Sequence, residues 1–132
     1  MKLSINTASR APIYQQIVQQ IREAVARGEL AAETRLPSVR ELARELVVNP
    51  NTIARAYSEL EREGLVVSRQ GLGVFAALAQ PELTKAARER RLRGIVDQLL
   101  IEAVHLGFTA DDVLRQVSSR LERFQWSSAG TK

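Results

Sequence analysis

The sequence predicts an α+β fold that is mostly α, and three observations support this prediction. Apolar residues recur at helical spacing in five segments of the 132-residue chain. Only residues 65–75 place branched and aromatic side chains in two short runs around a basic, glycine-containing turn. After a connector at 76–80 only helical patterns follow. We therefore predict two domains: residues 1–78 with three helices and a β-hairpin, and residues 79–132 with two antiparallel helices.

Local residues mark where the first predicted helix ends and where the second begins. The first spans about residues 12–27 and ends at Gly28. The second begins at Ser38, because Glu41 three residues later completes a reciprocal capping arrangement. Both have one apolar stripe, and these stripes are expected to form core: Ile13, Ile17, Ile21, Ala24 and Val25 in the first, and Val39, Leu42, Ala43 and Leu46 in the second.

The third predicted helix starts with Asn49 as its cap and Pro50 in its first turn, where a missing N–H costs nothing. Its apolar stripe includes Tyr57, which we expect to be a buried ring with a satisfied hydroxyl. At about 100° per residue, polar side chains lie opposite that stripe. They are Asn51, Arg55, Ser58 and Arg62, with Thr52 on the flank. Amides, hydroxyls and guanidinium groups suit base edges and phosphates, so this face predicts DNA contact.

A plainer interpretation of the same arginines stays open at this point. By composition alone, an exposed face with i,i+4 partners such as Arg55–Glu59 explains them as ordinary solvated residues.

The hairpin is predicted after Gly64, with strands at 65–68 and 73–75. Its tip holds Arg69, Gln70 and Gly71. A glycine tip can turn tightly and bring backbone amides near a phosphate or into a minor groove. We expect Arg69 and Gln70 to be the groups that read DNA from this tip.

The order and spacing of these parts resemble the winged helix-turn-helix of GntR-family bacterial transcription regulators. The matching segments are LPSVRELA at 36–43, NPNTI at 49–53, LEREGL at 60–65 and RQGLG at 69–73. The chain is similar to the short YtrA-type branch, in which a two-helix tail replaces a large effector-binding domain. The resemblance implies transcription control, with transporter genes as common targets. By position, it implies DNA contacts at Arg40, Asn49, Asn51, Thr52, Gln70 and Gly71; the face and turn arguments add Arg55 and Arg69.

Two positions depart from the family pattern. Val47 stands where a glycine is common between the two helices, and Ala32–Glu33 replaces a Pro-Gly pair. Because a β-branched residue resists positive φ, we expect the turn at Val47 to have different backbone angles.

The tail is predicted to hold a helix over 81–106, ended by Gly107, and a last helix capped by Thr109. Two helices cannot enclose an apolar seam alone, whereas two such pairs make a four-helix bundle. We therefore expect a homodimer that selects an inverted-repeat operator on double-stranded DNA. The apolar positions are Leu92, Ile95, Val96, Leu99, Leu100, Ala103 and Leu106, then Val113, Leu114, Val117, Leu121 and Phe124.

Composition restricts the other function classes. The chain has no cysteine, one histidine and a net charge of +4, which permits nucleic acid without demanding it. We expect no enzyme activity, no cofactor and no metal; His105 near Glu102 fits a helix-end cap better than a ligand. Without a long apolar run or a secretory signal, we expect a cytoplasmic protein that does not bind membranes.

Three questions stay open from the sequence. A helical protein-interaction module without DNA is the alternative function. A basic cluster, Lys85, Arg88, Arg90, Arg91 and Arg93, either touches phosphates beside the operator or is a solvated helix start. No convergent polar group names a small-molecule effector.

Overall fold

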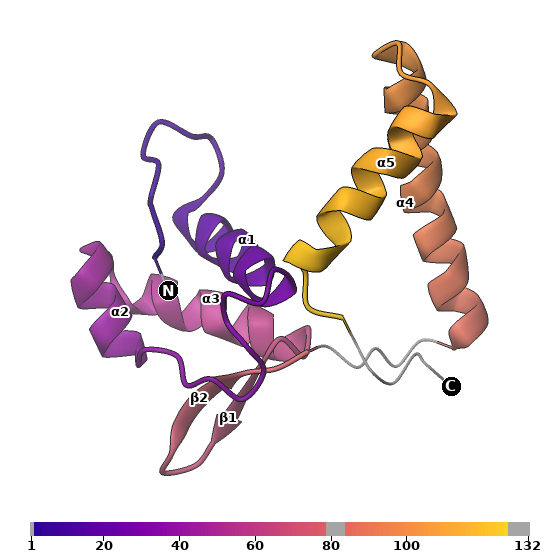
Figure 1. Cartoon of the computed structure of the whole chain (residues 1–132). Coiled ribbons are helices and arrows are strands. Elements are labelled where there is room, and N and C mark those ends of the chain that lie inside the picture. Colours follow the sequence, from indigo (N-terminus) through magenta and orange to yellow (C-terminus); the bar gives the residue numbers. More distant parts are fainter. Residues whose placement is uncertain (1, 79–83, 127–132) are drawn as a thin grey trace. The chain divides into compact units, whose positions relative to one another are not determined.

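A computed structural model of the chain describes residues 2–78 and 84–126 (Figure 1). The described residues form two compact units: residues 2–78 with 124–126, and residues 84–123. Residues 124–126 thus pack with the first unit, although they belong to the predicted tail. The boundary placed between residues 78 and 79 stays a prediction, and the helix start predicted at residue 81 lies outside the described residues.

The first unit has three helices followed by a hairpin. The helices are α1 (Ile13–Ala26), α2 (Val39–Leu46) and α3 (Pro50–Arg62), and the strands are β1 (Val66–Arg69) and β2 (Gly73–Ala76). Figure 1 shows α1 and α2 on α3, with the hairpin extending away from the helices. The predicted stripes meet in one core, whose fully buried members include Ile17, Ile21, Leu36, Leu42, Ile53, Leu60 and Val66. The element types of this unit are therefore as predicted.

The hairpin is antiparallel, with Val66 opposite Ala76 and Arg69 opposite Gly73. A segment before α2 borders the free edge of β2. The Leu36 N–H donates to the Val74 carbonyl at 2.8 Å, and Ala76 exchanges backbone hydrogen bonds with the segment 33–34, each also 2.8 Å long. The hairpin is thereby anchored to the chain that leads into α2 and α3.

The predicted caps are present at both motif helices. The Ser38 hydroxyl accepts from the Glu41 N–H at 3.0 Å, and the Glu41 carboxylate accepts from the Ser38 N–H at 2.7 Å. The Ser38 N–H and hydroxyl hold the pKa of Glu41 below its usual range. At the start of α3, the Asn49 side-chain oxygen accepts from the Asn51 N–H at 2.8 Å, with Pro50 in the first turn.

The expectation for the turn at Val47 is wrong. Val47 ends α2 in the left-handed region at φ 56° and ψ 52°, the conformation that a glycine would adopt there. Its N–H donates to the Ala43 carbonyl, and its side chain is 88% exposed. Glu33, which stands where the family pattern has a glycine after proline, also has a positive φ, of 76°. The surrounding fold therefore imposes the glycine geometry on both residues.

The second unit contains α4 (Lys85–His105), α5 (Ala110–Arg120) and a short 3-10 helix, Leu121–Arg123. The tight turn at Gly107 sends α5 back in the opposite sense to α4 (Figure 1). Thr84 caps α4, and Thr109 caps α5 as predicted, with Asp112 completing a second reciprocal box. The start of α4 at Lys85 and its cap were not predicted.

The apolar positions of this second unit are largely exposed. Ala103 is the only residue of α4 or α5 that is buried within the described chain. The exposed fractions are 64% for Ile95, 47% for Leu99 and 66% for Leu114. A hollow of about 200 Å³ lies between α4 and α5, and its floor is formed by apolar side chains that include Leu99 and Val117. Within the described residues, no helix is both long and apolar enough to cross a membrane.

Candidate nucleic-acid interface

The beginning of α3 presents the main group of predicted contacts. Asn51 is exposed and Thr52 is half-buried, while Ile53 beside them is fully buried in the core. Asn49 is exposed, but its side-chain oxygen is used in the cap. The Asn49 amide nitrogen and the whole Asn51 side chain are thus the groups here that can meet a base edge.

The buried side of α3 fixes this orientation. Tyr57 is only 5% exposed, and its hydroxyl donates to the Pro37 carbonyl at 2.7 Å, as predicted. Burial raises the pKa of the Tyr57 hydroxyl well above its usual range. Because Pro37 directly precedes Ser38, the cap of α2, this bond holds α2 and α3 in a fixed relation.

Arg55 lies against α1. Its guanidinium carbon is 3.8 Å from the ring centroid of Tyr14, whose hydroxyl accepts from Gln15 at 3.2 Å. The Arg55–Glu59 pair considered from the sequence is not among the ion pairs of the described residues. Glu59 pairs instead with Arg62 at 2.6 Å, and this bond raises the pKa of Arg62. Sequence reasoning missed Tyr14, because no local spacing links it to α3.

Arg40 is exposed on α2. None of the ion pairs or side-chain hydrogen bonds found in residues 2–78 and 84–126 involves it. Its guanidinium group is therefore available to a phosphate or a guanine.

The hairpin of β1 and β2, here called the wing, places Gln70 and Gly71 at its exposed tip, where Gly71 has φ 79°. Arg69 differs from the prediction, because it is the last residue of β1 rather than part of the turn. It pairs with the Glu33 carboxylate at 2.7 Å and lies 4.8 Å from the Phe75 ring centroid. Arg69 thus lies at the base of the tip. Glu33, which holds it there, belongs to the Ala32–Glu33 pair that departs from the family pattern.

Gly73 begins β2 with a positive φ. A Cβ atom there would lie 2.8 Å from the Nε atom of Arg35, and its φ is 122°. The positive φ therefore favours glycine here, whereas the flexible end of the Arg35 side chain could shift away from a Cβ atom.

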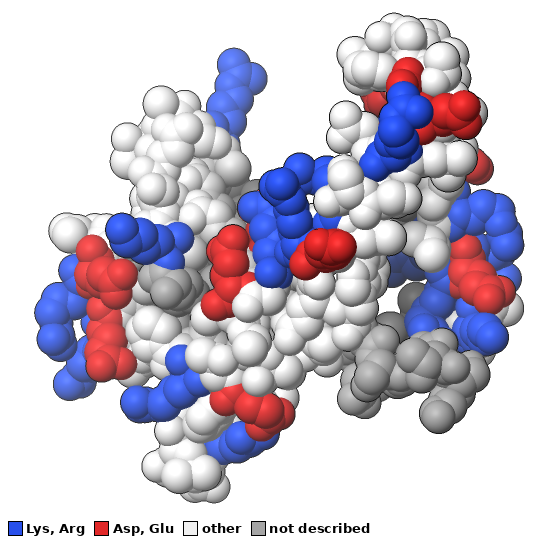
Figure 2. Space-filling model, in the orientation of Figure 1, with Lys and Arg blue, Asp and Glu red and all other residues white. Residues whose placement is uncertain are grey.

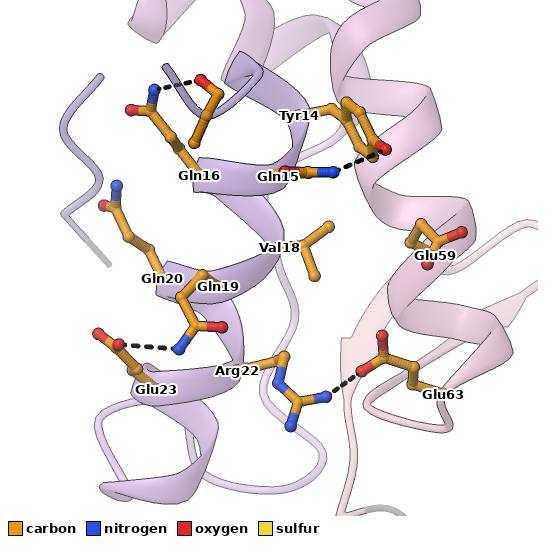
Figure 3. Close-up of a pocket in the computed structure, with 11 residues that line it drawn as sticks. Tyr14, Gln15, Gln16, Val18, Gln19, Gln20, Arg22, Glu23, Glu59 and Glu63 are labelled. Carbon is orange, nitrogen blue, oxygen red and sulfur yellow. Dashed lines mark hydrogen bonds and ion pairs between the residues drawn. The ribbon is translucent and has the colours of Figure 1, made fainter. Parts of the chain in front are cut away.

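A polar groove of about 620 Å³ runs beside α1 and α3 (Figure 3). Its side chains largely bind one another: Gln19 donates to Glu23 at 3.0 Å, and Arg22 pairs with Glu63. Because these groups are already engaged, the groove offers no convergent set for an effector. In the described part of the chain, no group of three or more His, Cys, Asp or Glu could hold a metal ion.

Charge on this surface is mixed. On the face shown in Figure 2, acidic side chains lie among the basic ones over the first unit. On this face, the basic side chains therefore do not form one broad area.

Three packed helices, the last beginning with exposed amides, followed by a β-hairpin wing, define a winged helix-turn-helix DNA-binding transcription regulator. A family model described as "Bacterial regulatory proteins, gntR family" matches residues 13–76. The chain is 36% identical over 105 residues to the HTH-type transcriptional repressor YtrA of Bacillus subtilis (strain 168), covering 80% of this chain and 81% of that protein. It belongs to the GntR family.

Two solved structures agree with this assignment. YtrA from Sulfolobus acidocaldarius, a GntR-family transcription factor, has 36% identity and a TM-score of 0.58, over 75% of this chain and 97% of that one. The DNA-binding domain of AraR, solved in complex with operator ORX1, has 27% identity and a TM-score of 0.52, over 58% of this chain and 99% of that one.

Proposed function

We propose that this regulator acts as a repressor by binding an inverted-repeat operator as a homodimer, with α4 and α5 as the dimer contact. The observation that carries the proposal is the exposed apolar face of the second unit. Ile95, Leu99 and Leu114 are each about half or more exposed, and the hollow between the helices has an apolar floor. A second copy would cover this face and fill the hollow, as in a four-helix bundle. The name of the Bacillus relative supports repression.

The dimer is tested by placing a charge in the seam. Leu99→Glu should shift the protein from dimer to monomer in sedimentation equilibrium, because it buries an unpaired carboxylate in the contact. The matched control is Gln98→Glu, which adds the same charge at the neighbouring exposed position. A Leu99→Glu protein that remains dimeric contradicts the proposed contact. This variant is preferable to deleting the tail, because deletion would also remove residues 124–126 from the first unit.

Base reading is proposed for Asn49, Asn51 and Thr52 in the major groove, with Gln70 and Gly71 at a neighbouring groove or phosphate and Arg40 on a phosphate or guanine. Arg55 and Arg69 take supporting roles, since one lies on Tyr14 and the other pairs with Glu33.

The test of base reading is Asn51→Ala. This change should weaken operator binding by about 1–3 kcal/mol and blur the preference at one base pair. Binding to random duplex of equal length should change little. An equal loss of affinity for both duplexes would show that Asn51 contacts the DNA backbone rather than a base.

We further infer that the protein is not an enzyme, works in the cytoplasm and controls transporter genes, as its YtrA-type resemblance implies. Selection of bound fragments from genomic DNA tests the last inference directly. The alternative of a protein-interaction module without DNA has no support, because the outer face of α3 is polar and exposed.

A further inference from the structure

The first turns of α4 carry an unusual concentration of positive charge. Residues 85–93 hold five basic side chains and one acidic one, a net charge of +4 that equals the net charge of the whole chain. The remaining residues therefore balance to zero. The five basic residues, here called the α4 basic cluster, are Lys85, Arg88, Arg90, Arg91 and Arg93.

The arrangement of the α4 basic cluster does not fit the solvated side of an amphipathic helix. At about 100° per residue, Arg88 and Arg91 fall on one side of α4, and Arg90 and Arg93 fall on the other. The apolar stripe begins only at Leu92. The first two turns are therefore charged all round and extend beyond the seam proposed for the dimer. A helix that is polar all round requires many side-chain pairs or a partner of its own.

Internal pairing does not neutralise this charge. All five members of the cluster are exposed, and no ion pair of residues 2–78 or 84–126 includes them or Glu89, the acidic residue in their midst. The cluster is thus a set of free cations at the beginning of the tail.

Chain connectivity keeps the cluster close to the wing. Leu78 follows β2 closely, and Thr84 caps α4. Six residues of fully extended chain span at most about 22 Å, the length of about six base pairs of duplex. This length allows the cluster to reach DNA beside the half-site when the winged helix is bound there.

We propose that the α4 basic cluster binds the phosphates of duplex DNA immediately outside the bases read by the winged helix. This inference rests on the proposed function, because it requires the winged helix to be seated on an operator. Each arginine that meets a phosphate releases a condensed counterion, so the cluster sets part of the salt dependence of binding without adding sequence preference.

The test compares two triple variants of the full-length protein with the same loss of charge. Arg88→Gln/Arg90→Gln/Arg91→Gln removes most of the cluster, and the control removes three arginines from the last part of the tail. The control is Arg115→Gln/Arg120→Gln/Arg123→Gln. Affinity is measured from about 0.05 to about 0.3 M salt, a range that includes ~0.1 M, where the Debye length is about 10 Å.

On an operator with ten or so base pairs of flank on each side, the cluster variant should lose up to about 2.7 units of the slope of log affinity against log salt per protomer, or about 0.9 for each arginine. Near 0.1 M salt it should bind at least about tenfold more weakly than wild type. On an operator trimmed to the two half-sites, wild type and variant should converge. The control should keep the wild-type slope on both duplexes.

Two outcomes would overturn the proposal: an unchanged slope in the cluster variant, and an equal loss in the control. If the slope is unchanged and binding to phosphatidylserine vesicles is lost, the cluster is assigned to a membrane surface. If circular dichroism shows that the triple variant is unfolded, Arg90→Gln and Arg91→Gln alone provide the test, at about 0.9 slope units each. Failure of the proposed function would give a different result, because the wild-type protein would then bind the operator and a scrambled duplex equally well.

Discussion

Replacing Val47 by glycine should stabilise the protein. A left-handed backbone costs an L-residue about 1–2 kcal/mol, and Val47 has this conformation at φ 56°. Glycine removes that cost but adds about 0.4–1 kcal/mol of conformational entropy to the unfolded chain. The side chain is 88% exposed, so little burial is lost. The net expectation is a gain of about 0.5–1 kcal/mol in the free energy of unfolding.

Urea denaturation at fixed protein concentration measures this gain, since dimerisation links stability to concentration. Val47→Ala is the matched control, because alanine keeps the Cβ that causes most of the strain and should recover less than half of the gain. Operator affinity should stay at the wild-type value, because the Asn49 cap is untouched. A glycine variant that is less stable than both wild type and Val47→Ala would show that the turn at Val47 is not strained.

Three further perturbations test other contacts. Tyr57→Phe removes the hydrogen bond to Pro37 and should lower the free energy of unfolding by about 1 kcal/mol. Because burial raises the pKa of Tyr57, the stability of the wild type should also fall as pH rises above 10, and that of the variant should fall less. Ser38→Ala should cost about 1 kcal/mol in urea. Since Ser38 lowers the pKa of Glu41 from 4.5, the wild type should lose capping stability as pH falls through that lowered pKa, and Ser38→Ala should lose less. Gln125→Ala should speed amide exchange at residue 32, and unchanged exchange would contradict the contact.

Local signals in the sequence were sufficient to predict the helices of the first unit. Ser38 with Glu41, and Asn49 with Pro50, are caps whose partners lie within three residues, so their geometry follows from the pattern alone. The apolar stripes likewise predicted burial, including that of Tyr57, because helical period decides which side faces the core.

The contacts that position the candidate site were not predictable in the same way. Arg55 meets Tyr14 across 41 positions of sequence, and Arg69 meets Glu33 across 36. No periodicity specifies such pairs, because they depend on how elements pack. The angles at Val47 were mispredicted for a related reason: local propensity argued against positive φ, and tertiary packing overrode it.

Gln125 lies far along the chain, yet it completes the end of α1. Its side-chain amide donates to the Val25 carbonyl at 2.8 Å, its side-chain oxygen accepts from the Ala32 N–H at 3.3 Å, and its own N–H donates to the Ala26 carbonyl at 2.5 Å. A chimaera that joins residues 1–78 to a foreign oligomerisation module would remove all three hydrogen bonds, although the Val25 carbonyl would keep its bond from the Gly28 N–H at 3.1 Å. A gene fusion at that junction should therefore lower the stability of the end of α1, and a transplanted DNA-binding domain needs a substitute for Gln125.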